Sequence, residues 1–193
     1  MKLKTSITVI TGCLVIFLFL MLPVFLSMEK TKDDIESKFK GSEFTLIDVN
    51  NEVITESSFE CPLTAIFFGF TNCPDICPTT MSLINTSVER IPNPPKVIMV
   101  TADPERDSPE VLKEYLLAFN ETFQGLSGSF KNLNALAAQL GFTFRKIPGP
   151  VLGTYSIQHS DSIAVINPKA EYVGLLEITS EPNDMITVLE SLF

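Results

Sequence analysis

The sequence predicts an α/β fold in which helices cover a central, largely parallel β-sheet. Two nearly continuous apolar runs of strand length, Leu63 to Phe70 and Val97 to Thr101, lack a polar face, as is typical of strands in the middle of a covered sheet. Segments with apolar residues at helical spacing lie between and after these runs. Strands that alternate with helices in this way form layered folds with parallel strands at the centre.

The chain begins with a candidate membrane span. Lys2 and Lys4 are followed by no charged residue until Glu29, and residues 7–26 are almost entirely apolar. Twenty residues of helix span roughly 30 Å, the thickness of the hydrocarbon core of a bilayer. A cleaved signal peptide is the alternative, but the end of the run lacks a small-x-small cleavage site. We therefore expect one N-terminal transmembrane helix within an anchor of residues 1–28, a charged tether over 29–43 and one domain over 44–193.

The charge pattern orients this anchor and restricts the partners. The positive charges before the apolar run place the domain on the outer side of the membrane. We expect a single-pass protein of the bacterial inner membrane that faces the periplasm, with the mitochondrial inner membrane as the alternative. Removing Lys2 and Lys4 from the 14 basic residues leaves 12 against 23 acidic ones, a net charge of −11. Because such a surface repels phosphate groups, we expect no nucleic-acid partner.

Local patterns divide the rest of the domain into further elements. Turn residues between two short apolar segments predict an N-terminal hairpin from Phe44–Asp48 and Glu52–Thr55. Capping signals and helical spacing predict helices over Pro78–Ile91, Pro109 to about Phe119, Phe130–Leu140 and Asp184–Leu192. Further strands are expected at Phe142–Ile147, Ser162–Ile166 and Tyr172–Ile178.

Two cysteines stand where the first buried strand gives way to a helix. Cys73 and Cys77 are separated by three residues, and Pro78 follows them. Pro78 suits the first turn of a helix and disfavours helical geometry at Cys77, so we expect a stiff loop at a helix N-terminus. There the helix dipole and free N–H groups favour thiolates over thiols. Soft thiolates bind Cu(I), zinc or iron–sulfur clusters, whereas a redox pair is more often Cys-x-x-Cys.

His159, the only histidine in the chain, is the candidate third ligand. A lone histidine is more often a surface or core residue than a ligand, but the dithiolate loop reverses this expectation. Two sulfurs and one nitrogen form a low-coordinate set that Cu(I) accepts and that Cu(II) can also use. Structural zinc would require a fourth protein ligand, which the sequence does not plainly offer. The sequence therefore points to a copper site at Cys73, Cys77 and His159.

The chain resembles the Sco/SenC family. The motifs that carry this resemblance are GFTNCPDICPTT at 69–80, VTADPERDSPE at 100–110, GLSG at 125–128 and the pair His159-Ser160, in the order and spacing of that family. The resemblance covers about residues 44–192. It implies a thioredoxin-like fold with a central mixed sheet, and one copper ion per chain bound by Cys73, Cys77 and His159. It also implies a role in building the dinuclear copper site of cytochrome c oxidase subunit II.

Three further residues are expected near the ligands. Asp103 follows the second buried strand at the same edge of the sheet as the cysteines. It either makes an outer-shell or transient contact with the copper or caps the turn together with Arg106 and Asp107. Tyr155 either packs over the metal or belongs to the core. The family usually has an aspartate just before the ligand histidine, where this chain has Gln158. Asp161 is the nearby carboxylate that can take its place as the partner of the imidazole.

Two functions remain open at this point. A metallochaperone would bind copper, dock on the oxidase subunit and transfer the ion. A thiol–disulfide oxidoreductase would reduce the cysteines of the oxidase copper site, with Cys73 attacking and Cys77 resolving or the reverse, and a thioredoxin-like reductant would regenerate it. By family resemblance His159 holds the place of the cis-proline of thioredoxin-like reductases, which favours metal binding. Cys13 and Cys61 are expected to take no part in either activity.

Overall fold

The computed structural model describes Met21 and residues 44–59, 63–169, 171–178 and 181–191. The expected anchor (apart from Met21), the tether, Cys13 and Cys61 lie outside these residues. Within the described part of the chain, no helix is both long enough and apolar enough to cross a membrane. Residues 38–193 form one structural unit, which carries the sheet and the candidate site.

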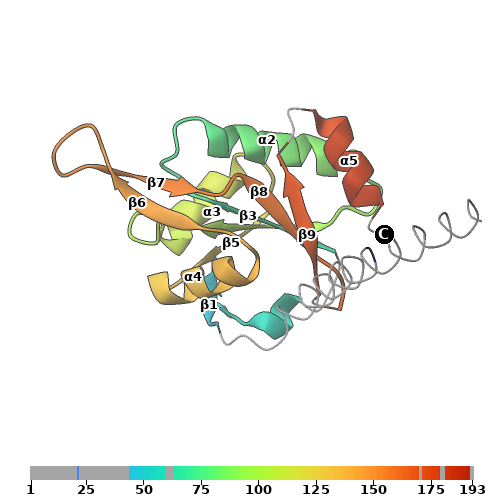
Figure 1. The fold of residues 1–193 in the computed structure, drawn as a ribbon, viewed down its shortest axis with the longest axis horizontal. Helices are drawn as coiled ribbons and strands as arrows, with labels where there is room; N and C mark the ends of the chain where they lie inside the picture. Colours follow the sequence, from blue (N-terminus) through green and yellow to red (C-terminus); the bar gives the residue numbers. More distant parts are fainter. Residues whose placement is uncertain (1–20, 22–43, 60–62, 170, 179–180, 192–193) are drawn as a thin grey trace, which may run out of the picture. The chain divides into compact units, whose positions relative to one another are not determined.

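A seven-stranded mixed sheet forms the centre of this unit (Figure 1). Its strand order is β2-β1-β5-β4-β3-β8-β9. The central strands run parallel to one another and are β3 (Thr64–Gly69), β4 (Lys96–Thr101) and β5 (Gln124–Ser127). The outer strands pair antiparallel and are β1 (Leu46–Asp48), β2 (Val53–Ile54), β8 (Ser162–Ile166) and β9 (Tyr172–Glu177). The two apolar runs of the sequence thus lie side by side at the centre, as predicted.

Helices cover the two faces of the sheet (Figure 1). On one face α2 (Ile76–Val88) packs against α5 (Pro182–Glu190), and α4 (Phe130–Gln139) lies on the other. A further α-helix, α3 (Pro109–Leu117), packs against β5, and a short 3-10 helix, η1, spans Glu56–Phe59. Ser108 caps α3 by accepting a hydrogen bond from the backbone N–H of Val111. This cap agrees with the Ser-Pro start that the sequence predicts.

Two strands are absent from the sequence-based expectations. β5 has four residues and contains Gly125, so it is too short and too rich in glycine to give a clear strand pattern. β7 (Tyr155–His159) pairs antiparallel with β6 (Phe144–Pro148). Together they form a two-stranded sheet that is separate from the central one. His159 therefore lies at the end of a hairpin strand.

The start of α2 also differs from the prediction. The helix begins at Ile76 and not at Pro78, so Cys77 lies inside its first turn. The first N–H groups of a helix have no acceptor within the helix, so Pro78 removes no helical hydrogen bond there. The preference of a residue before proline for extended geometry is overridden at Cys77.

Phe67 and Phe68 are neighbours in β3, and their side chains pack on opposite faces of the sheet. The ring of Phe68 packs against Phe142 and Phe144, with centroids 4.7 and 6.1 Å away. The ring of Phe67 stands nearly perpendicular to the His159 imidazole, with centroids 6.0 Å apart. Because successive side chains of a strand point to opposite faces, β3 separates an apolar layer from the face that carries the candidate site.

Candidate metal centre

Three side chains from different elements converge beyond the carboxyl end of β3. Cys73 lies in the loop after β3, Cys77 in the first turn of α2 and His159 at the end of β7. The two sulfurs and one imidazole nitrogen all lie within 4.8 Å of one another. Sγ of Cys77 is 3.5 Å from Nε2 of His159, and Sγ of Cys73 accepts a hydrogen bond from the backbone N–H of Cys77 at 3.4 Å. The fold thus brings together the three residues that the sequence singles out.

The separations between these donors suit one small metal ion. Zinc bonds, for comparison, are about 2.3 Å to sulfur and about 2.0 Å to nitrogen, so two sulfurs on one ion lie at most roughly 4.6 Å apart. The three donor atoms here lie within 4.8 Å of one another, so they need to move little or not at all to bind one ion. Among the described residues, no further histidine, cysteine or carboxylate joins the group. Two thiolates and one imidazole without a fourth protein ligand suit Cu(I) better than structural zinc.

A backbone hydrogen bond determines which imidazole nitrogen faces the cysteines. Nδ1 of His159 lies 2.9 Å from the carbonyl oxygen of Ser160. A carbonyl oxygen can only accept, so Nδ1 carries the proton of the neutral imidazole and donates it. The lone pair of Nε2 is then directed toward Cys77, as a metal ligand requires. The rings of Phe67 and Phe70 flank the imidazole and stand nearly perpendicular to it, with centroid distances of 6.0 and 5.9 Å.

The two ligand cysteines differ in burial. Both are free thiols, and Cys77 is fully buried whereas Cys73 is half-buried. Burial raises the pKa of the Cys77 thiol above its ordinary value, and the neighbouring Cys73 adds to this rise. Contrary to the expectation from the helix N-terminus, the thiolate of Cys77 is therefore disfavoured in the metal-free protein, because desolvation raises the pKa of its thiol. A metal ion that binds Cys77 must displace a proton from it.

The residues expected around the ligands have other partners in this structure. The carboxylate of Asp103 is fully buried, accepts a hydrogen bond from the Tyr155 hydroxyl at 2.9 Å and forms an ion pair with Arg106. Asp161 is exposed, and the imidazole Nδ1 uses the carbonyl of Ser160 instead. The roles expected for Asp103, Tyr155 and Asp161 around a bound copper ion stay predictions.

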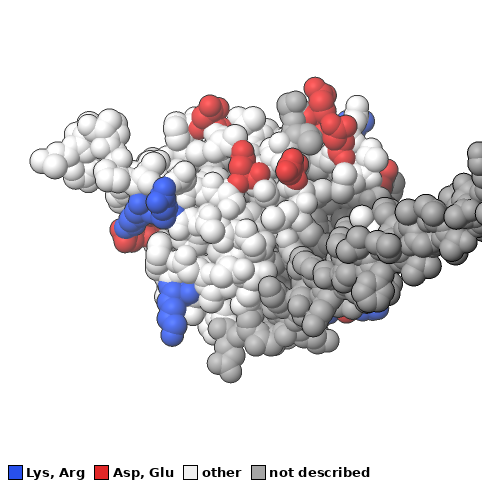
Figure 2. Space-filling view, in the orientation of Figure 1, with Lys and Arg blue, Asp and Glu red and all other residues white. Residues whose placement is uncertain are grey.

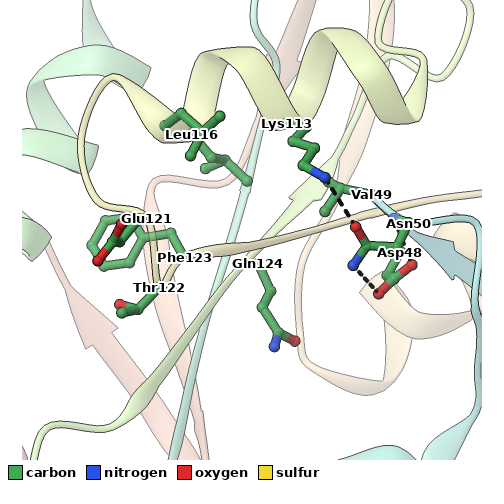
Figure 3. Close-up of a pocket in the computed structure, with 10 residues that line it drawn as sticks. Asp48, Val49, Asn50, Lys113, Leu116, Glu121, Thr122, Phe123 and Gln124 are labelled. Atoms are coloured by element: carbon green, nitrogen blue, oxygen red, sulfur yellow. Dashed lines mark hydrogen bonds between the residues drawn. The ribbon is translucent and has the colours of Figure 1, made fainter.

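The surface of the described residues has two hollows of similar volume, and only one of them borders this donor cluster. One, of about 330 Å³, borders His159 and is lined by β6, β7 and the residues beside them. The other, of about 370 Å³, lies between α3, the turn after β1 and the start of β5 (Figure 3). There Lys113 donates to the side chain of Asn50 at 3.1 Å, and Asn50 donates to Asp48 at 3.3 Å. The residues that line this second hollow include no histidine or cysteine, so it offers no comparable ligand set.

The charges on the surface are unevenly placed around the hairpin. On the face shown in Figure 2, acidic side chains are scattered over the body, and one of the groups of basic side chains lies beside the β6–β7 hairpin, with an acidic group next to it. Arg145 and Lys146 are the basic residues of β6, and Gly149 to Thr154 at the hairpin tip are uncharged. The segment that carries His159 is thus less acidic than the rest of the domain.

The family model described as SCO1/SenC matches residues 32–193 of this sequence. The chain belongs to the SCO1/SenC family. The match covers the whole of the described domain and the three candidate ligands. It confirms the family that the sequence motifs indicate.

Individual Sco proteins are similar to the chain over most of its length. A SCO2-like protein of Rickettsia felis is 33% identical over 155 residues, which cover 78% of this chain and 75% of the relative. The copper-bound structure of Bradyrhizobium japonicum ScoI is 28% identical, with a TM-score of 0.67 and coverage of 78% and 97%. Copper-bound yeast Sco1 is also 28% identical, with a TM-score of 0.68 and coverage of 78% and 88%. These structures confirm the thioredoxin-like α/β fold.

Gly69 is a site residue of this Sco protein that the sequence analysis does not identify. A Cβ atom at this position would lie 2.6 Å from the ring of Phe67 and 3.2 Å from both Sγ of Cys77 and Cε of Met99. The only sequence signal is a glycine at the end of an apolar strand, directly before the cysteine loop. Its lack of a side chain lets α2 bring Cys77 close to the sheet.

Replacing Gly69 with alanine is expected to lower both stability and copper affinity. The added methyl group overpacks a closed core, which typically destabilises a protein by about 1–3 kcal/mol, and it displaces the sulfur of Cys77. Urea unfolding and copper competition with a chromophoric chelator measure the two effects. Gly125→Ala is the matched control, because its methyl group would meet Leu112 at 2.6 Å and lies away from the cysteines. Equal losses of copper affinity in both variants would contradict a specific role of Gly69.

Proposed function

We propose that this Sco protein is a copper metallochaperone that delivers copper to the dinuclear site of cytochrome c oxidase subunit II. It binds one copper ion per chain, as Cu(I) or Cu(II), through Cys73, Cys77 and His159. The observation that carries the proposal is the donor set: Cys77 and His159 are 82 positions apart in the sequence, yet their donor atoms lie 3.5 Å apart. Sco family proteins are linked to copper handling for cytochrome c oxidase, and related structures contain copper.

The exposure of the ligands supports release of the metal as well as binding. Cys77 is fully buried, whereas Cys73 and His159 are half-buried. An incoming thiolate or imidazole of an acceptor can therefore approach a bound ion from the side of Cys73 and His159. A three-ligand set also leaves a coordination position open for that incoming donor. These features favour a carrier over a permanent structural site.

We also propose where the protein works. The apolar run of residues 7–26 anchors it as a single span in the bacterial inner membrane, and the domain faces the periplasm. The tether of residues 29–43 then keeps the metal site within reach of a membrane-bound oxidase subunit. Protease treatment of intact spheroplasts tests this topology, because a periplasmic domain is cleaved without lysis.

The second candidate function is reduction of the oxidase cysteines. Two free thiols whose sulfurs lie within 4.8 Å of each other favour it. In that reaction Cys73 and Cys77 give up two electrons and two protons and form a disulfide, and the disulfide of the acceptor becomes two thiols. A thioredoxin-like reductant would then restore the pair. This reaction has no step for His159.

A transfer experiment tests the proposed function directly. Full-length protein loaded with one equivalent of copper is mixed with the metal-free, reduced copper domain of subunit II, and the two are separated for metal analysis. We expect the copper to appear on the acceptor. Copper that stays on the Sco protein would contradict the chaperone function. New acceptor thiols without metal transfer, in a parallel mixture with the oxidised acceptor, would favour the reductase.

A further inference from the structure

We propose that the segment from Asp103 to Asp107 acts as a clamp that sets the distance between the two halves of the metal site. Asp107 holds the cysteine loop, and Arg106 positions the hairpin that carries His159. This inference rests on the proposed copper site and adds positioning residues to it. The segment connects β4 to α3 and contributes no ligand of its own.

The cysteine half is tied to the clamp through Asp107. One carboxylate oxygen accepts from the Thr71 hydroxyl at 2.6 Å, and the other accepts from the Thr71 backbone N–H at 3.1 Å. The second oxygen also accepts from the Thr101 hydroxyl, at 2.6 Å. Asp107 is fully buried, so these hydrogen bonds are shielded from water. Because Thr71 stands two residues before Cys73, they fix the start of the cysteine loop against the end of β4.

The histidine half is tied to the clamp through Arg106. Its guanidinium lies 4.0 Å from the centre of the Tyr155 ring and donates to the Tyr155 carbonyl at 3.4 Å. The same guanidinium pairs with Asp103, which accepts the Tyr155 hydroxyl at 2.9 Å. Tyr155 opens β7 and His159 ends it, and both side chains lie on the same face of the strand. Arg106 and Asp103 therefore hold the strand that places the imidazole.

Phe144 packs on Phe68 and holds the base of the hairpin, but no strand ladder joins the hairpin to the central sheet, so the contacts of Arg106 add to this attachment. β6 and β7 pair only with each other in the described structure. Lys146 of β6 adds to the attachment, since it pairs with Glu105 and lies 4.4 Å from the centre of the Tyr155 ring. Arg106 also lies 5.9 Å from the ring of Phe70, which stands nearly perpendicular to the imidazole. Arg106 of the clamp therefore contacts both Phe70, which packs against the imidazole, and Tyr155, which lies on the same strand as His159.

If Arg106 only capped its own turn, the expected effect of replacing it would differ from that of a residue that positions His159. A cap stabilises the whole domain, so its loss would affect metal binding whether or not His159 is present. A positioning residue acts only through the imidazole, so its effect disappears when the imidazole is removed. Double-mutant cycles separate these two cases.

The test measures copper affinity in full-length variants by chelator competition. Arg106→Gln is expected to lower affinity about 10- to 100-fold, the range for residues that orient metal ligands. In the His159→Ala background the same substitution is expected to have no further effect. Thr71→Val, which removes one bond to Asp107 and acts through the cysteines, is expected to weaken binding in both backgrounds. Arg90→Gln is the matched control, because Arg90 is exposed and its side chain donates a hydrogen bond to Asn183, away from the metal site.

Hydrogen exchange of the metal-free protein gives a second readout. Arg106→Gln is expected to speed amide exchange in β6 and β7 and to leave α2 unchanged, whereas Arg90→Gln changes neither strand. Equal losses of copper affinity in both backgrounds, or unchanged exchange in the hairpin, would overturn the clamp. If the wild-type protein bound no copper, the proposed function would fail, while the exchange experiment would still test the attachment of the hairpin.

Discussion

Replacing Cys77 with alanine is expected to lower the copper affinity of this Sco protein by about 100-fold or more. Structural zinc sites with four ligands bind with about 10–16 kcal/mol, or roughly 3 kcal/mol for each ligand, and 1.4 kcal/mol corresponds to a factor of ten. Cys77 is the innermost donor, because its sulfur is fully buried and lies 3.5 Å from Nε2 of His159. Two remaining donors cannot hold the ion as three do. Equilibrium competition with a Cu(I) chelator measures the loss.

A second cysteine variant controls for loss of a thiol as such. Cys61→Ser is expected to leave copper affinity unchanged, because Cys61 precedes β3 in the chain whereas the cysteine loop follows its far end. Thermal unfolding of Cys77→Ala shows whether the domain remains folded, since removal of one buried sulfur leaves only a small cavity. A folded Cys77→Ala protein with wild-type copper affinity would refute the assigned ligand set.

The His159→Ala variant is expected to abolish copper incorporation into the oxidase and to leave the cysteine pair redox-active. The imidazole is a copper ligand in the proposed site, so its loss removes the only nitrogen donor of the cluster. Thiol–disulfide exchange depends on the protonation and accessibility of the two thiols and needs no third ligand. The variant should therefore keep a disulfide reduction potential similar to that of the wild type.

Two measurements on His159→Ala, made together, separate the candidate functions. Copper content of the purified oxidase is determined in cells that contain the variant at the normal protein level, and the potential is obtained by redox titration in vitro. Gln158→Ala is the control, because Gln158 is exposed on the same strand and bonds to Arg145. Normal copper in the oxidase of His159→Ala cells would favour the reductase over the metallochaperone.

The central strands and the cysteine loop were predictable because their signals are local. β3 is buried at every position, so its sequence has no polar face to mask the strand. Ser108 and Pro109 mark the start of α3 within a few residues of chain. The spacing of Cys73 and Cys77 is also a local property. Each of these features can be deduced without knowing what packs against it.

The pairing of the hairpin and the contacts of the clamp join residues that are distant in sequence, so the sequence did not predict them. Tyr155, Ile157 and His159 alternate with polar residues, so a strand signal was present, but its pairing with β6 is not visible in that pattern. Arg106 and Tyr155 are 49 positions apart, and their contact follows only from the folded hairpin. The raised pKa of Cys77 likewise reflects burial by the assembled core, which the local sequence does not reveal.

X-ray absorption spectroscopy of the copper-loaded full-length protein tests the proposed copper site most directly. For Cu(I) we expect a first coordination sphere of two sulfur atoms and one imidazole nitrogen, with one copper ion per chain. The nitrogen should disappear in His159→Ala, and one sulfur should disappear in Cys77→Ala. A first sphere made of oxygen and nitrogen alone, or one that stays the same in both variants, would contradict a copper site at Cys73, Cys77 and His159.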